Sequence, residues 1–328
     1  MFTLIRPDVV NDTVNSLIEQ ADLSGNHFLA RWEILTAESG CMTGDPAVSV
    51  FAEAYLAGIR NYDVARAYAL CTNTVNSFGN RDGRADYDKL GFVPRSLTMT
   101  LENAYYDYCA GRFAATLGGT NAAAKLFARS KKLSQCLRSV RRQHAREKCR
   151  WFVDRLAWCH RRRPRLRRKQ SVSTRLVRAA RCAGLDEFDG HKLFLSYLTE
   201  FFEKTPASFK WNAYCNQANE PVHHTAYLFT YAGKPWLTQK WSRFITDHAY
   251  GPGLTGLCGN EDVGQMSAWY ILSAIGFHPV SPVTIFHHRQ PVVQKSDDPA
   301  RSEIIRAKPF PSSPIIIPRR TFISNPPS

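Results

Sequence analysis

Apolar residues recur at helical spacing over most of the chain, and this pattern predicts an all-α protein. The first such segment runs from Arg6 to Gly25, starts at Pro7 and has one apolar face formed by Val10, Val14, Leu17, Ile18 and Ala21. Further helices are predicted after Asp45 and over residues 63–77, 100–119 and 187–204, whereas the glycine-rich stretch 79–94 is predicted to be a loop. Successive helices with glycine-closed connections favour packed helical hairpins.

A polar, glycine-rich turn leads into an apolar helix between Gly256 and Val280. Asn260 is the predicted N-cap, and Glu261 and Asp262 then fall in the first helical turn. The exposed N–H groups of a helix start stabilise a carboxylate, so this position suits an ionised acid. The helix is expected to end at Gly276. By spacing alone Asp262 is either an ordinary helix-start charge or the acid of a catalytic site.

Composition narrows the class of protein. The chain has 328 residues, 44% of them hydrophobic, which fits an ordinary globular protein. No run of about 18 apolar residues occurs, and the first ten residues lack the pattern of a signal peptide, so neither a membrane span nor export is indicated. The nine cysteines form no C-x-x-C pair, which argues against a zinc site or a disulfide framework. The oligomeric state is left open.

Two motifs resemble glycoside hydrolase family 92. They are NEPVHHTAYLFTYAGKPWLTQ, within Tyr214–Trp241, and GLCGNEDVGQMSAWY, which begins at Gly256. The blocks around Asp45 (GDPA) and over Thr100–Gly119 (TLENAYYDY) are similar to further family segments. The resemblance implies a calcium-dependent exo-α-1,2-mannosidase that acts on mannose-terminated glycans of the N-glycan type, outside the cytoplasm.

The resemblance also implies a fold and its division. We expect part of an (α/α)₆ toroid of the six-hairpin glycosidase type, with the family's N-terminal β-sandwich missing and its C-terminal β segment degraded. Residues 1–124 and 187–282 are expected to form the helical toroid. Residues 125–186 are expected to be a disrupted arginine-rich segment, and residues 283–328 an irregular tail.

The family's site residues are carried over onto matching positions. Asp262 is the expected general base of an inverting hydrolysis, which needs roughly 6.5–9.5 Å between the acid and the base for a water molecule. The expected calcium ligands are Asn219, Glu220 and Asp262, whose oxygens suit this ion. The expected substrate-binding residues are Asp45, Glu220, His223, His224 and Asn260. A general acid is not found, because the chain contains no EGN-type triplet such as the family uses.

The formal net charge of +15 arises from residues 125–181, where Glu147 and Asp154 are the only acids. Three interpretations stay open. The segment is a solvated charge run, or it binds nucleic acid through its arginines with Trp151 and Trp158, or it results from a shifted reading frame. We favour the last, because a charge run alone is a weak motif. Two functions from other classes also remain: nucleic-acid binding by 125–181, and mannose binding by a non-catalytic remnant through Glu220 and calcium.

Overall fold

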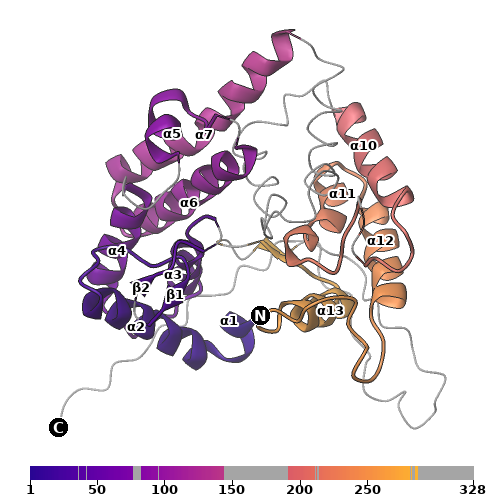
Figure 1. Ribbon diagram of the computed structural model, residues 1–328, viewed down its shortest axis with the longest axis horizontal. Helices are drawn as coiled ribbons and strands as arrows, with labels where there is room; N and C mark the ends of the chain where they lie inside the picture. Colours follow the sequence, from indigo (N-terminus) through magenta and orange to yellow (C-terminus); the bar gives the residue numbers. More distant parts are fainter. Residues whose placement is uncertain are drawn as a thin grey trace. The chain divides into compact units, whose positions relative to one another are not determined.

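The computed structural model describes residues 1–143 and 191–286, except 36, 42, 77–82, 95, 211, 213, 281, 283 and 284. The described elements are mainly helices, and the strands have two residues each, so the prediction of a mainly helical protein is confirmed (Figure 1). Among these helices none has the length and apolar character needed to cross a bilayer. We describe residues 1–143 as the first helical part and residues 191–286 as the second.

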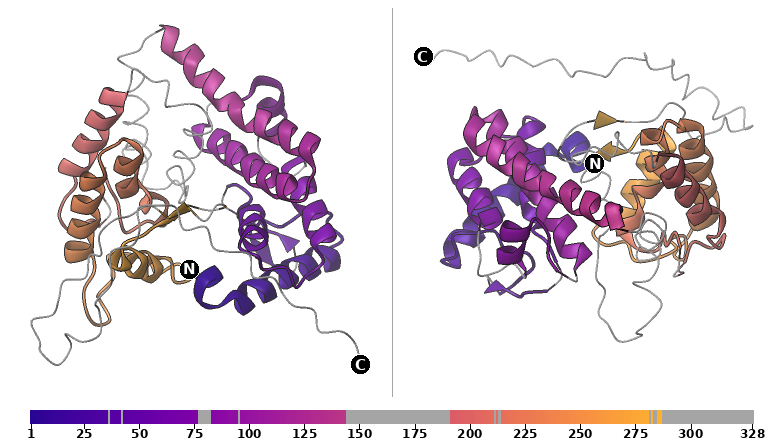
Figure 2. Two further views of the ribbon diagram at one scale, coloured as in Figure 1. Left: turned by 180° about the vertical axis from the view of Figure 1, so that it is seen from behind. Right: turned by 90° about the horizontal axis from the view of Figure 1, so that it is seen from above.

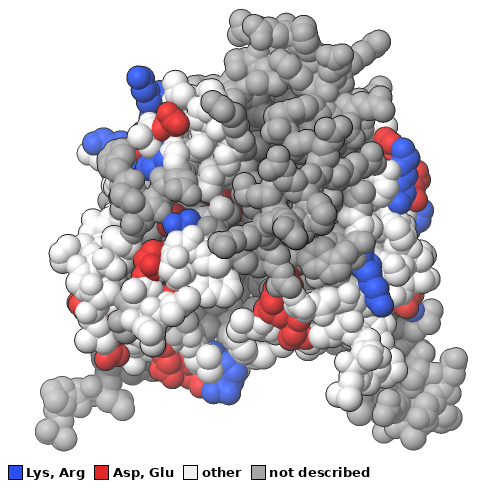
Figure 3. All heavy atoms as spheres, in the orientation of Figure 1, with Lys and Arg blue, Asp and Glu red and all other residues white. Residues whose placement is uncertain are grey.

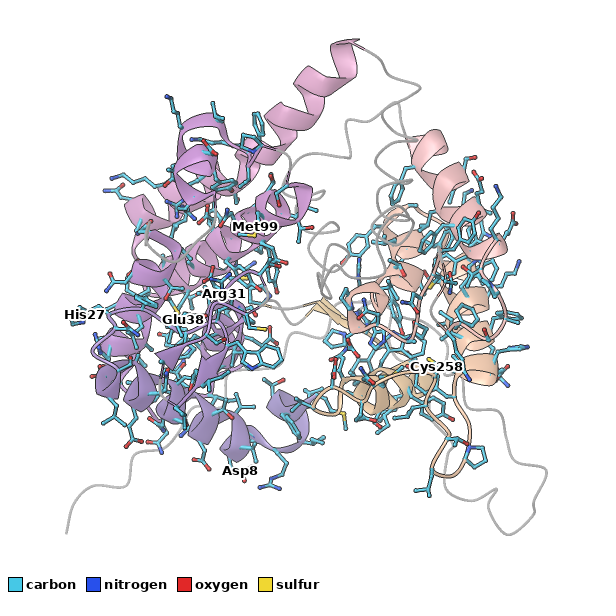
Figure 4. All side chains as sticks on the ribbon, viewed as in Figure 1. Asp8, His27, Arg31, Glu38, Met99 and Cys258 are labelled. Atoms are coloured by element: carbon cyan, nitrogen blue, oxygen red, sulfur yellow. The ribbon has the colours of Figure 1, made fainter. Side chains whose placement is uncertain are left out.

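The first helical part contains seven helices and one short hairpin within its described residues (Figure 2). The helices are α1 (Phe2–Ile5), α2 (Pro7–Leu23), α3 (Pro46–Leu56), α4 (Val64–Asn76), α5 (Arg84–Leu90), α6 (Leu97–Thr116) and α7 (Thr120–Gln143). The hairpin pairs β1 (Glu33–Ile34) antiparallel with β2 (Ala37–Glu38). Figure 4 shows the side chains of Arg31 and Glu38 beside this hairpin, where they form a mostly buried ion pair.

Helix α6 is the centre of the first helical part, since it packs against α3, α4, α5 and α7. It begins after Ser96, whose hydroxyl accepts a hydrogen bond from the Met99 N–H and caps the helix. Its Phe113 is fully buried and packs against Tyr55 of α3, with ring centroids 4.9 Å apart. At Gly111 a Cβ atom would lie 2.8 Å from the Phe127 ring, so glycine is needed there for α7 to approach.

The predicted loop 79–94 is wrong in its centre, because residues 84–90 form helix α5. Gly83 and Gly91 flank this helix with φ angles of +74° and +81°, which glycine adopts without strain. Arg84 and Tyr87 of the helix are buried. Glycine-rich flanks indicated a loop, but burial of these two side chains against the rest of the fold stabilises a helix of seven residues.

A buried ion-pair network connects α5, α6 and α7. Asp107 of α6 accepts two hydrogen bonds from Arg129, at 2.7 Å and 2.6 Å. Arg84 of α5 lies 3.5 Å from the same carboxylate and 3.0 Å from Asp88. The side chains of Asp107 and Arg84 are both 0% exposed. The negative charge of Asp107 therefore neutralises the fully buried guanidinium group of Arg84 and that of Arg129, whose side chain is 19% exposed.

The second helical part consists of short helices around an aromatic core. Its elements are α10 (His191–Glu203), η2 (Glu220–Val222), η3 (Thr225–Tyr227), α11 (Leu228–Tyr231), α12 (Pro235–Ala249), α13 (Gln265–Ile275), and β3 (Pro279–Val280) paired antiparallel with β4 (Ile285–Phe286). In the core, Phe202 of α10 stacks on Trp241 of α12 with ring centroids 5.1 Å apart. Trp269 of α13 is also buried.

Two predicted boundaries differ from the structure. The division between residues 124 and 125 falls inside α7, which continues from Thr120 to Gln143. Helix α13 begins at Gln265 with Gly264 as its N-cap, not at Glu261, so Asn260 is not the cap and Asp262 is not in the first turn. The rest of the arginine-rich segment, 144–186, and most of the tail 283–328 lie outside the described residues.

Charged side chains are dispersed over the face shown in Figure 3, where Lys, Arg, Asp and Glu lie among other residues. The basic segment that distinguishes this sequence, from residue 144 onward, belongs to the residues that the structure does not describe. The prediction of a nucleic-acid interface there stays a prediction.

Candidate functional site

The turn before α13 is a folded structure held by its own backbone. Gly251 donates its N–H to the Gly256 carbonyl at 2.8 Å, and Gly256 donates to the Gly253 carbonyl at 3.1 Å. A Cβ atom at Gly256 would lie 1.9 Å from the Gly251 carbonyl oxygen, so only glycine fits. We call residues 256–264 the base turn, because they contain the predicted base Asp262.

The base turn lies directly against the segment that contains Asn219 and Glu220. A Cβ atom at Gly259 would lie 2.3 Å from the carbonyl oxygen of Ala218 and 2.6 Å from its Cα. This backbone contact brings the predicted calcium ligands of η2 close to the residues that follow Gly259. Two motifs that are about 40 residues apart in the sequence thus form one region of the second helical part.

Substitution of Gly259 by alanine is expected to destabilise the second helical part by about 1–3 kcal/mol, because the added methyl group overlaps the Ala218 backbone. The measurement is urea unfolding followed by circular dichroism. Gly251→Ala is the matched control, since a Cβ atom at Gly251 meets nothing within 4 Å. Equal unfolding midpoints for the two variants would show that the contact is not tight.

Glu261 precedes the N-cap Gly264 and bonds to the first turn of α13. Its carboxylate accepts hydrogen bonds from the Ser267 N–H at 3.0 Å and from the Ser267 hydroxyl at 2.9 Å. These bonds satisfy an N–H group at the helix start, the function that was predicted for Asn260. Sequence reasoning missed Glu261 because it lies six residues ahead of its partner rather than at the usual cap spacing.

Asp262 has an exposed side chain and an uncommon backbone conformation. Its φ angle is +40°, and that of Val263 is +59°, although neither residue is glycine. Left-handed conformations of this kind are strained for a β-branched residue such as valine and cluster at functional sites. The carboxylate of the neighbouring Glu261 accepts a hydrogen bond from Ser267. Asp262 is therefore the acid of the base turn that faces water.

His223 is buried, and both of its ring nitrogens are engaged by protein groups. Nε2 lies 3.1 Å from the Gln217 carbonyl oxygen, which can only accept, so Nε2 carries the proton. Nδ1 then accepts a hydrogen bond of 3.3 Å from the Gln265 amide. Burial lowers the pKa of His223 to about 4, so the ring is neutral near pH 7. These bonds favour a structural role over the predicted contact with substrate.

His224 differs from His223 because neither of its ring nitrogens forms a well-aligned hydrogen bond within the described part of the chain. The Pro221 carbonyl lies near it, and the side chain is 5% exposed. Burial, and then the neighbouring His278 and His223, lower its pKa well below the usual range. Asn216 is 1% exposed, and neither the oxygen nor the nitrogen of its side-chain amide forms a well-aligned hydrogen bond within the described residues. Nothing in the spacing pointed to Asn216.

The oxygens of Asn219, Glu220 and Asp262 are of the type that calcium prefers. Glu220 opens η2 and is partly buried, and Asn219 precedes it as the N-cap without using its side chain for capping. Within the described residues, no group of three or more His, Cys, Asp or Glu side chains is arranged to hold a metal. These three residues suit calcium by donor type alone, and an ion there would need further oxygens from the main chain, water or a ligand.

The predicted site residues lie in different parts of the structure. The second helical part contains Asn219, Glu220, His223, His224, Asn260 and Asp262, which the contact of Gly259 with Ala218 and the bond between His223 and Gln265 hold in one region. Asp45 belongs to the first helical part, where it is 7% exposed and precedes α3 without a capping hydrogen bond from its side chain. The roles assigned to these residues stay predictions.

The comparisons with known proteins agree on one family. The model of the glycosyl hydrolase family 92 catalytic domain matches residues 1–297 and thus includes the arginine-rich segment. A family GH92 α-mannosidase from Bacteroides thetaiotaomicron is similar in structure, with 30% identity, a TM-score of 0.68, and 88% of this chain and 40% of that chain covered. No curated protein sequence matches.

An inverting mannosidase of family GH92 from Bacteroides thetaiotaomicron VPI-5482 is also similar, with 26% identity and a TM-score of 0.66 over 89% of this chain and 43% of that chain. A GH92 glycosyl hydrolase, ccman5, is 18% identical with a TM-score of 0.56 over 85% of this chain and 42% of that chain, which supports the fold alone. The chain spans about two fifths of the length of these structures.

Proposed function

Because the chain belongs to glycoside hydrolase family 92, we propose that it removes terminal α-1,2-linked mannose from N-glycans by calcium-assisted inversion. The observation that carries this proposal is the base turn, in which Asp262 is exposed and Gly259 packs against Ala218, the residue before Asn219 and Glu220. Similar structures from Bacteroides thetaiotaomicron are mannosidases, and one of them is described as inverting. We further propose a partial (α/α)₆ toroid as the architecture and a place of action outside the cytoplasm.

In this mechanism Asp262 removes a proton from the attacking water. Its exposed side chain can reach a water molecule, while Glu261 stays bonded to Ser267 and holds the turn. Asn219 and Glu220 would hold calcium, which supplies positive charge for the sugar's hydroxyl oxygens when bound. Asn260 and His224 are the proposed sugar-binding residues of the second helical part, and Asp45 is the proposed contact from the first helical part.

The leaving oxygen lacks an identified proton donor, because no EGN-type triplet occurs in the sequence. General acid assistance contributes about 10²–10⁴ to the rate of a glycoside hydrolase. A substrate whose leaving group needs no proton avoids this loss. We therefore expect the chain to cleave a nitrophenyl α-mannoside and to cleave an unactivated mannobiose much more slowly.

The test is hydrolysis of 4-nitrophenyl α-mannoside by the purified chain with calcium, with excess chelator, and as the Asp262→Asn variant. We expect calcium-dependent release of nitrophenol that falls to the buffer level in Asp262→Asn. Asp247→Asn is the matched control, because Asp247 is an exposed carboxylate on α12 that pairs with Arg243 on the surface. Equal rates for wild type and Asp262→Asn would refute the role of Asp262.

A non-catalytic mannose-binding remnant is the second candidate, favoured by the absence of the acid motif and by the spare hydrogen-bonding capacity of His224 and Asn216. It predicts that calorimetry detects mannose binding that chelation abolishes, without turnover of the nitrophenyl substrate.

The third candidate function is nucleic-acid binding. It predicts affinity for DNA or RNA that falls steeply with added salt and is lost when residues 125–181 are deleted.

A further inference from the structure

The second helical part contains a closed ring of contacts that the proposed chemistry does not use. Its members are Gln217, His223, Trp269 and Tyr250, and Gln265 is attached to it through His223. Gln217 lies in the loop before η2, His223 follows η2, Trp269 and Gln265 belong to α13, and Tyr250 follows α12. Every member contacts the next through a hydrogen bond or a ring stack. The ring therefore connects segments that are distant in the sequence.

His223 is the member with the most connections. Its ring donates to the Gln217 carbonyl and accepts from Gln265, and its main-chain oxygen accepts the Trp269 indole N–H at 2.6 Å. One residue thus connects its own loop to α13 at two places, one turn apart. Because His223 is 3% exposed, its bonds to Gln217 and Trp269 are shielded from water, whereas the bond to Gln265 is partly buried.

Tyr250 completes the ring from the other side. Its ring stacks on Trp269 with centroids 5.5 Å apart and an interplanar angle of 11°. Its hydroxyl accepts a hydrogen bond of 3.0 Å from the Gln217 amide. Gln217 is therefore held through its carbonyl by His223 and through its side chain by Tyr250, which leaves the loop little freedom.

Residues of this contact network lie close in the sequence to the proposed calcium ligands and to the proposed base. Asn219 and Glu220 lie between Gln217 and His223, and Asp262 lies three residues before Gln265. Gln217 and His223 thus hold both sides of the proposed calcium segment, and Gln265 holds the point where the base turn enters α13. A change in the bond between His223 and Gln265 moves one of these groups relative to the other.

We propose that His223 is a positioning residue that sets the distance between Glu220 and Asp262 through its bond to Gln265. The proposal rests on the proposed function, since the groups that it aligns are the proposed calcium ligand and the base. In this proposal His223 acts through Gln265 and not directly on the substrate or the reacting atoms. Its neutral Nε2–H tautomer is the form that the arrangement requires, because Nδ1 must accept from Gln265.

The test compares His223→Gln, Gln265→Met and the double variant. His223→Gln keeps a donor for the Gln217 carbonyl but has no acceptor atom at the position of Nδ1, whereas Gln265→Met removes the same bond from an exposed position without changing the buried ring. We expect each single variant to lower kcat for 4-nitrophenyl α-mannoside by about fivefold to tenfold, the value of one hydrogen bond, with KM changed less than twofold.

The double variant is expected to lose no more than either single variant, because both remove the same bond. Additive losses would overturn the proposal. His248→Gln is the matched control, since His248 is an exposed histidine on α12 outside the ring. Its kcat is expected to equal that of the wild type.

A second measurement separates this proposal from the proposed function. Hydrogen–deuterium exchange of residues 256–264 is expected to be faster in both single variants than in wild type and in His248→Gln. If the wild type releases no nitrophenol, the proposed function fails, and the exchange measurement still decides whether His223 and Gln265 hold the base turn. Unchanged exchange in both variants would overturn the positioning role.

Discussion

Replacement of Asp107 by alanine is expected to lower the free energy of unfolding by about 3–5 kcal/mol, because it removes the fully buried carboxylate that pairs with Arg84 and Arg129. Asp107 binds Arg129 through two hydrogen bonds and lies 3.5 Å from Arg84, whose side chain is 0% exposed. Asp88 remains as a partner of Arg84 at 3.0 Å, but it is partly exposed and cannot replace a fully buried carboxylate.

The measurement for Asp107→Ala is urea unfolding of the full chain at pH 7, followed by circular dichroism. Asp86→Ala is the control, because Asp86 lies on α5 like Arg84 and has an exposed side chain. We expect its unfolding midpoint to stay within error of the wild type. If the two variants unfold at the same urea concentration, the network between α5, α6 and α7 does not hold the first helical part together.

Acidification from pH 7 to pH 4 is expected to lower the free energy of unfolding by about 3 kcal/mol through His223 alone, since one pKa unit corresponds to about 1.4 kcal/mol. Burial lowers the pKa of this ring from 6.5 to about 4 in the folded protein. Between these values the unfolded chain binds the proton and the folded protein does not. Stability is therefore complete above about pH 6.5 and is lost as the pH falls toward 4.

The check on this pH dependence is urea unfolding of wild type, His223→Gln and His248→Gln at pH 7 and pH 4. The loss is expected to be smaller in His223→Gln than in the other two proteins, because glutamine at position 223 does not titrate. His224, whose pKa burial also lowers, adds to the loss in all three proteins. An equal loss in wild type and His223→Gln would contradict the buried, neutral state of His223.

The helices were predicted well wherever local signals and burial agree. Pro7 and Pro46 stand at the first positions of α2 and α3, and Gly276 ends α13 in a left-handed conformation, as expected. The apolar face predicted for α2 is the buried one. Periodicity and capping act between neighbours in the sequence, so the residues themselves contain this information.

Two local predictions were wrong because distant residues decided the outcome. Helix α5 forms in a stretch that reads as a loop, since Arg84 and Tyr87 are buried and Arg84 pairs with Asp107 of α6. The start of α13 is displaced to Gln265 because Glu261, rather than Asn260, satisfies the helix N–H groups. A hydrophobic pattern shows neither the pairing of Arg84 with Asp107 nor that Glu261 replaces Asn260 at the start of α13.

The residue patterns of this chain determined its helical class, most helix positions and, through two motifs, its family, because each depends on residues close together in sequence. Tertiary structure decided which groups meet. It placed Gly259 against Ala218, left Asp262 exposed and engaged both nitrogens of His223. Burial and hydrogen-bond partners depend on contacts between distant segments, and these contacts gave two adjacent histidines, His223 and His224, different surroundings.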